Sequence, residues 1–159
     1  MNNSEAIFDG LRRMALGLKP ADLGLGEIRP GQPYGIVMDI DVDGQTATLT
    51  SFLSGDASLY LSTGGGTIGG GEHDSVANAA KKFVEGAGEH LREMAPADEQ
   101  PRPGAGQVSF YVLTSKGVVG ANRFEQDLGE GRDALSPLFY AGQDVITQLR
   151  LIEERRQPG

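Results

Sequence analysis

Residues 34–62 read YGIVMDIDVDGQTATLTSFLSGDASLYLS, and this stretch decides the fold class. Its first third alternates apolar side chains with small or acidic ones, which is the period-two pattern of a strand with one apolar face. Asp43-Gly44 is a strong hairpin signal, and a return strand rich in threonine follows it. Gly55-Asp56 then turns the chain into a third strand. The stretch predicts a three-stranded antiparallel meander.

The flanking segments predict three helices and a second hairpin. Apolar residues recur at helical spacing in three regions, namely 1–19, 74–94 and 136–155. Two further runs alternate like strands around a Ser-Lys-Gly turn, at 108–113 and 118–124. The predicted order is therefore α-β-β-β-α-β-β-α.

This order predicts a single α+β domain over residues 1–159, with a five-stranded antiparallel sheet and helices packed on it. We divide it into an N-terminal helix (1–19), an arm (20–33) and a sheet-and-helix body (34–155). Residues 95–106, rich in proline and glycine, are expected to form an exposed linker within the domain. The arrangement is similar to profilin, roadblock, GAF and PAS domains in architecture alone, because no sequence motif connects the chain to any of those families.

Composition narrows the function classes. The chain has no cysteine, which excludes disulfides and thiolate chemistry and fits a cytoplasmic protein. The net charge of −8 opposes binding to nucleic acid. No apolar run is long enough to span a membrane, so we expect no membrane partner.

The unusual feature is a glycine-rich loop at residues 63–72, between the third strand and a helix. Glycines allow the backbone of such a loop to approach a ligand closely. The free N–H groups at the start of the following helix would favour a ligand that is an anion. Candidate ligand-binding residues in this loop and directly after it are Thr63, Gly64, Gly65, Gly66, Gly69, Gly70, Gly71 and His73. The loop is not a Walker motif, because Glu72-His73-Asp74 stands where Gly-Lys-Ser would be required. A tightly turned connection or a contact with a partner explains the same residues.

Other polar groups are weaker candidates. Arg132 lies in a second loop and would supply positive charge if the two loops met. Glu72, His73 and Asp74 point in different directions at a helix start, and we assign no catalytic residue and no metal site to them. The run D-x-D-x-D-G at 39–44 opens like an EF-hand, yet its twelfth position is a threonine and strands flank it. We interpret its aspartates as residues on the solvent-exposed face of a strand.

The function that this sequence favours is a non-enzymatic protein-interaction or regulatory module. Apolar residues off the main stripe of the last helix favour a protein partner or a homodimer, and they are Phe139, Tyr140, Ile146 and Leu151. The alternative is a small-ligand-binding domain whose glycine loop holds an anionic or nucleotide-like group. We expect no cofactor, and whether the chain is an enzyme is left open, with the sequence leaning against it.

Overall fold

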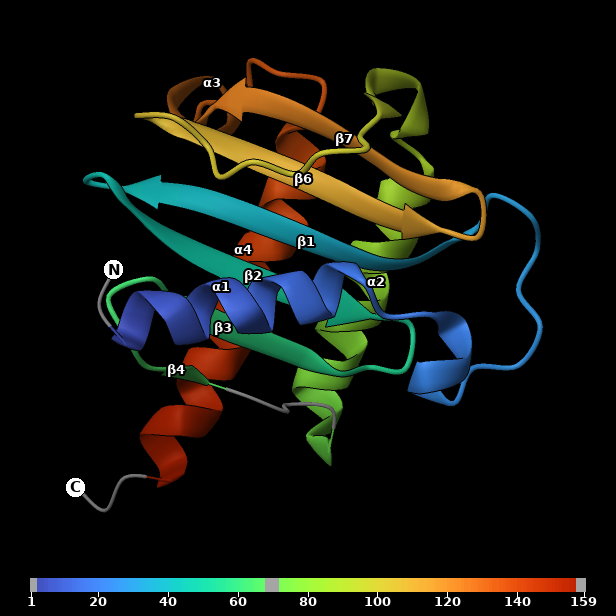
Figure 1. Ribbon diagram of the computed structural model, residues 1–159, viewed down its shortest axis with the longest axis horizontal. Coiled ribbons are helices and arrows are strands. Elements are labelled where there is room, and N and C mark those ends of the chain that lie inside the picture. Colours follow the sequence, from blue (N-terminus) through green and yellow to red (C-terminus); the bar gives the residue numbers. More distant parts are fainter. Residues whose placement is uncertain (1–2, 68–71, 157–159) are drawn as a thin grey trace.

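The computed structural model describes residues 3–67 and 72–156, and these form one antiparallel sheet with helices on both faces (Figure 1). The strand order is β4-β3-β2-β1-β6-β7-β5. The strands are β1 (Pro33–Val42), β2 (Gln45–Phe52), β3 (Ala57–Leu61), β4 (Gly66–Thr67), β5 (Ala95–Pro96), β6 (Gln107–Thr114) and β7 (Gly117–Phe124). No helix in the described ranges is long and apolar enough to cross a membrane.

The prediction of five strands is wrong, because the described residues alone form a sheet of seven. The α+β class, the meander β1–β2–β3 and the hairpin β6–β7 are confirmed. The two additional strands, β4 and β5, contain two residues each and pair at opposite edges of the sheet. Strands this short have no alternating pattern, and one carries glycine and the other proline, so the sequence does not reveal them.

Four α-helices occur in the described part of the chain: α1 (Asn3–Leu16), α2 (Asp74–Gly88), α3 (Glu125–Gly129) and α4 (Ser136–Arg156). Short 3-10 turns lie at Pro20–Leu23 and Leu91–Glu93. The segment before α4, where the sequence places Arg132 in a loop, therefore begins with the helix α3. The second helix also ends earlier than expected, because residues 91–93 tighten into a 3-10 turn.

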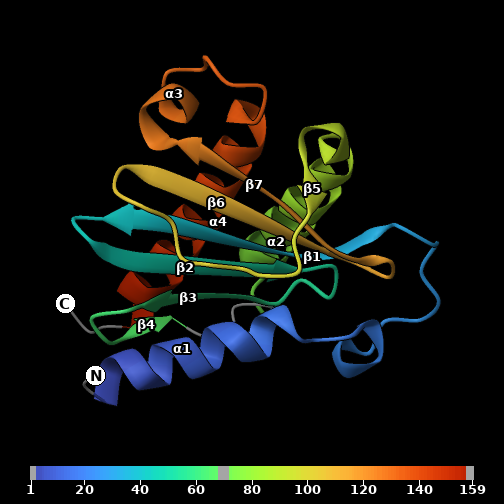
Figure 2. The ribbon, with the colours of Figure 1, turned by 45° about the horizontal axis from the view of Figure 1, so that its top comes forward.

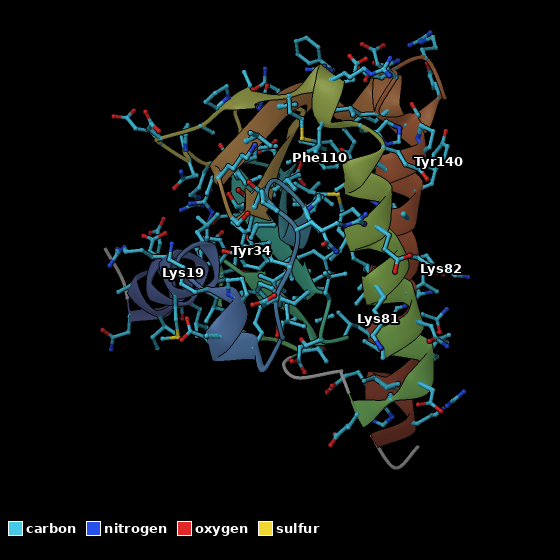
Figure 3. All side chains as sticks on the ribbon, turned by 90° about the vertical axis from the view of Figure 1, so that its right-hand side faces the viewer. Lys19, Tyr34, Lys81, Lys82, Phe110 and Tyr140 are labelled. Atoms are coloured by element: carbon cyan, nitrogen blue, oxygen red, sulfur yellow. The ribbon has the colours of Figure 1, made fainter. Side chains whose placement is uncertain are left out.

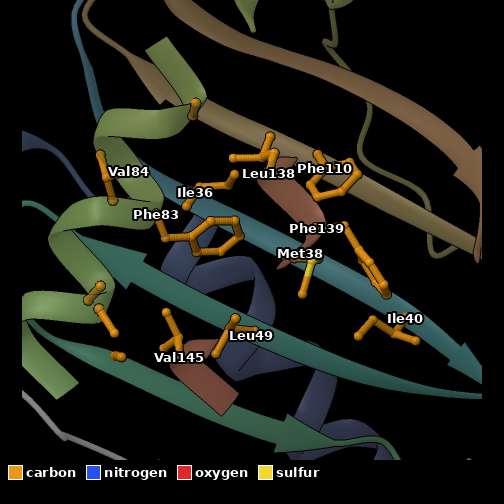
Figure 4. Close-up of a cluster of buried hydrophobic side chains, with 14 of the residues drawn as sticks. Ile36, Met38, Ile40, Leu49, Phe83, Val84, Phe110, Leu138, Phe139 and Val145 are labelled. Carbon is orange, nitrogen blue, oxygen red and sulfur yellow. The ribbon is translucent and has the colours of Figure 1, made fainter. Parts of the chain in front are cut away.

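The main core lies between one face of the sheet and the helices α2 and α4. Phe83 of α2 and Leu138, Phe139 and Val145 of α4 pack onto sheet residues such as Met38 (Figure 4). Glycine allows this close packing at one point, because a Cβ on Gly142 would lie 2.7 Å from the terminal methyl group of Met38. Figure 3 shows α2 and α4 on one side of the sheet and α1 on the other.

The opposite face is covered by α1 and by residues 97–106, which we call the strap (Figure 2). As the sequence predicts, no residue of this segment is buried, and the strap crosses the face and accepts hydrogen bonds from Arg12 and Tyr111. A second apolar cluster lies here; its buried members are Ala15, Tyr34, Val37, Phe52, Tyr111 and Leu113. The alternating pattern predicts a solvent-exposed face here, whereas α1 and the strap cover this face of the sheet.

Candidate functional site

Asp39 is the polar centre of the face under α1 and the strap. It lies in the central strand β1 and is fully buried, so its assignment to a wet strand face is wrong. Arg12 of α1 donates to its carboxylate from Nη2 at 2.7 Å and from Nε at 3.2 Å. Thr48 of β2 donates a further hydrogen bond to the carboxylate. The charge is buried because the N-terminal helix supplies an opposite charge, which sequence periodicity does not show.

A second arginine ties the strap to α1. The Nε of Arg102 donates to the hydroxyl of Thr46 at 2.8 Å, and Nη1 lies 3.2 Å from a carboxylate oxygen of Glu5. Its guanidinium also lies over the ring of Phe8, 5.1 Å from the centroid. Helix, strap and sheet are thus joined by directed contacts, so α1 has a defined position on the sheet.

The position of α1 creates a hollow between the helix and the turn from β3 to β4. It has a volume of about 260 Å³, and its wall is mainly apolar. The lining residues are Ser4, Ile7, Phe8, Leu11, Tyr60, Leu61, Gly64, Gly65 and Gly66. The described half of the glycine loop therefore lies against apolar side chains.

Two further hollows adjoin the first one. One, of about 190 Å³, continues along α1 past Leu11 and Tyr60 to Met14. The other, of about 350 Å³, lies on the far side of Leu61 and Gly66, against Ile146 of α4. The apolar side chains that line the three hollows form one continuous surface, which we name the apolar band. It comprises Ile7, Leu11, Met14, Leu59, Tyr60, Leu61 and Ile146.

Several side chains of the apolar band are open to solvent. Ile7 is 63% exposed, Met14 66% and Leu61 37%. The sequence predicts a helix here from the spacing of its apolar residues, and the structure buries Phe8, Arg12 and Ala15 of it. The signal that could have revealed the band is the width of the apolar arc, because residues 7, 8, 11, 14 and 15 exceed what one sheet contact buries.

Gly66 has a structural reason to be glycine. Its φ is +142°, and a Cβ there would lie 2.0 Å from the carbonyl oxygen of Leu59. Only glycine permits β4 to pair with β3 at this distance. The turn from β3 to β4 thus explains one glycine by backbone geometry alone.

The structure separates the predicted ligand residues. Thr63 is exposed, and Gly64, Gly65 and Gly66 line the first hollow, whereas Gly69, Gly70 and Gly71 lie outside the described residues. His73 precedes α2, with its Nε2 3.7 Å from a carboxylate oxygen of Glu72.

Arg132 is not brought to the glycine loop. It follows α3 and forms ion pairs with Asp127 and Glu130. Because α3 continues directly from β7, it lies near one edge of the sheet, whereas β4 forms the opposite edge (Figure 1). Arg132 therefore cannot share a ligand with Gly64, Gly65 and Gly66.

His90 and Asp41 have hydrogen-bond partners within the fold. The ring of His90 contacts the carbonyl oxygen of Gly86 within its own helix turn. Asp41 accepts hydrogen bonds from the backbone N–H groups of Gly44 and Gly106, so it stabilises the hairpin turn and the end of the strap.

Within residues 3–67 and 72–156, no three His, Asp or Glu side chains are grouped so that they could hold a metal ion.

Comparisons with known proteins identify no relative: no family model, no curated protein and no solved structure matches this chain.

Proposed function

We propose that this chain is a non-enzymatic protein-interaction domain that binds a partner's apolar side chains along the apolar band. The observation that carries the proposal is the continuity of the three hollows, which share Leu11, Tyr60, Leu61 and Gly66. Contiguous exposed apolar surface of this kind, bordered by polar groups, is typical of protein interfaces. The border here includes Arg150, Glu153 and Glu154 of α4.

The driving force would come from side chains that the fold leaves in water. Ile7 and Met14 expose about two thirds of their surface, at 63% and 66%. Covering them and Leu61 would contribute on the order of 1 kcal/mol each. Leu11 and Tyr60 are already half-buried and would shape the floor of the site.

The site is formed before any partner binds. Arg12 holds α1 to Asp39, and Arg102 holds it through Glu5 and Phe8. A wall fixed in this way loses little conformational entropy on binding, which favours affinity. This arrangement supports docking of a partner on a rigid groove.

The lining of the hollows supports an apolar occupant over an anionic one. No lysine, arginine or histidine lines the first hollow among the described residues. In the described lining of the other two hollows, the one cation is Arg150, which shares its hollow with Glu153 and Glu154. An anionic or nucleotide-like ligand needs more positive charge than this surface provides.

Site-specific photo-crosslinking in the native cell tests the proposal. A benzoylphenylalanine at position 7 or 61 should give a discrete crosslinked protein band. The control is Tyr140, an aromatic residue of α4 that is 47% exposed and donates to the carbonyl oxygen of Gly129 in α3, away from the band. Adding Leu11→Lys should remove the crosslink from position 61. Equal crosslinking yields at positions 7, 61 and 140 would overturn the proposal. The absence of a discrete crosslinked product at positions 7 and 61 would also overturn it.

A further inference from the structure

We infer that the partner on α1 is a second copy of this chain, and that the two α1 helices pair in antiparallel orientation and cross at Gly10. This inference rests on the proposed function, because Ile7 and Met14 belong to both surfaces.

Gly10 has no reason within the described part of the chain to be glycine. It lies in the middle of α1, and a Cβ added there would have no described heavy atom within 4 Å. Glycine is the poorest residue for a helix interior apart from proline. A helical glycine beside open space permits another backbone to approach closely.

The residues around Gly10 form one outward face. Ile7 precedes it by three positions and Met14 follows it by four, and both are largely exposed. Ala6, four positions before Gly10, is also exposed. Residues at these spacings are neighbours on a helix surface. The face therefore combines two large apolar side chains with two small residues.

This face is complementary to itself when reversed. In an antiparallel pair that crosses at Gly10, Met14 of each helix comes level with Ala6 of the other, and the two glycines face each other. Each Met14 therefore meets a small residue, and the two-fold axis repeats the contact. A self-complementary patch is what an isologous dimer interface requires.

The charges on α1 complement each other in the same arrangement. Arg13 is exposed and forms no ion pair with any residue that the structure describes. In the pair, it comes level with position 7 of the second helix, between Glu5 and Asp9. Both carboxylates lie near the guanidinium of Arg102, at 3.2 and 3.8 Å. Arg13 thus meets groups of opposite charge, although the chain as a whole carries −8.

The expected dimer is weak. A helix of 14 residues is about 21 Å long, so a pair buries less surface than the roughly 1,600 Å² of a standard interface. We therefore expect a dissociation constant in the micromolar range, on the order of 10–100 μM.

Sedimentation equilibrium of the full chain tests the inference. Wild type should fit a monomer–dimer equilibrium. Gly10→Ala should raise the unfolding temperature, because alanine favours the helix, and yet weaken the dimer by about tenfold or more. Gly10→Glu and Met14→Gln should leave only monomer. The matched control is Leu151→Gln, an apolar residue of α4 that is 36% exposed, and it should dimerise like wild type.

Two results would overturn the inference. One is a wild type that stays monomeric up to about 1 mM. The other is a Gly10→Ala variant that gains stability but dimerises like wild type. A monomeric wild type that still crosslinks to a different protein at position 61 would refute the self-association and leave the proposed function standing. Absence of both the dimer and the crosslink would refute both.

Discussion

The guanidinium of Arg12 and the carboxylate of Asp39, 27 positions apart in sequence, form a bidentate buried ion pair. The Nη2 of Arg12 also donates to the carbonyl oxygen of Gln100, 2.7 Å away. One side chain thus joins α1, the central strand and the strap. The position of α1 determines the shape of the apolar band, so this pair connects the fold to the proposed site.

Replacing Arg12 with methionine should destabilise the protein by about 3–5 kcal/mol, because Asp39 would be left buried without an opposite charge. Urea unfolding followed by circular dichroism measures the loss. The double variant Arg12→Met/Asp39→Leu should recover much of it, since no charge then remains in the interior. Equal stability of the single and double variants would contradict this role.

Gly66→Ala should separate β4 from β3, because its Cβ would overlap the carbonyl oxygen of Leu59. We expect a loss of about 2 kcal/mol or more in unfolding free energy, together with changed amide shifts along β3. The matched control is Gly65→Ala, which also has a positive φ, of +84°, but has open space at the Cβ position. The control should cost about 1 kcal/mol. A larger loss for the control would refute the steric argument.

Ile7→Gln and Met14→Gln should each change the unfolding free energy by less than about 0.5 kcal/mol, because both side chains are largely exposed in the monomer. Phe8→Ala should cost about 3 kcal/mol, because Phe8 is 2% exposed. Urea unfolding of dilute protein makes the comparison. A substantial loss for Ile7→Gln would mean that this residue serves the fold and not a partner.

Stability should fall in alkaline solution. Burial raises the pKa of the Tyr34 and Tyr111 hydroxyls, and the carboxylates of Asp22 and Asp39, respectively, raise the pKa further. For Tyr111, a hydrogen bond with Ser109 and the charge of Arg12 oppose the rise in pKa. The folded-state pKa values exceed those of the unfolded chain. This contribution to stability is therefore complete below about pH 10 and is lost as the pH rises through the folded values.

Urea unfolding between about pH 8 and pH 11 measures this alkaline loss. The double variant Tyr34→Phe/Tyr111→Phe should be less stable at neutral pH, because both hydroxyls donate to carbonyl oxygens, of Leu18 and Pro101. Its stability should nevertheless vary less with pH than that of wild type. An equal pH dependence in the two proteins would contradict the assignment to these tyrosines.

The predictable part of the fold is the part with a long periodic pattern. The strands β1, β2, β6 and β7 have eight to ten residues each, so their alternation is visible in the sequence. The two-residue strands β4 and β5 form through backbone pairing at the sheet edges, and no side-chain pattern marks them. Asp39 is polar in a strand, and only the tertiary partner Arg12 explains why it is buried.

The candidate site was predictable only in part. The glycine loop pointed to the turn from β3 to β4, where Gly64, Gly65 and Gly66 line the first hollow. Its apolar walls depend on the placement of α1 against Tyr60 and Leu61, which no local pattern encodes. Arg132 could not be excluded until the strand order placed it beyond β7.

Thiol accessibility in the cell shows whether a partner covers the apolar band. The chain has no cysteine, so single variants Ile7→Cys, Leu61→Cys and Tyr140→Cys each report one position. Maleimide labelling rates are compared between native cells and dilute purified protein. If a partner covers the band, labelling in cells should slow severalfold at positions 7 and 61 and stay unchanged at position 140. Equal relative rates at all three positions would contradict it.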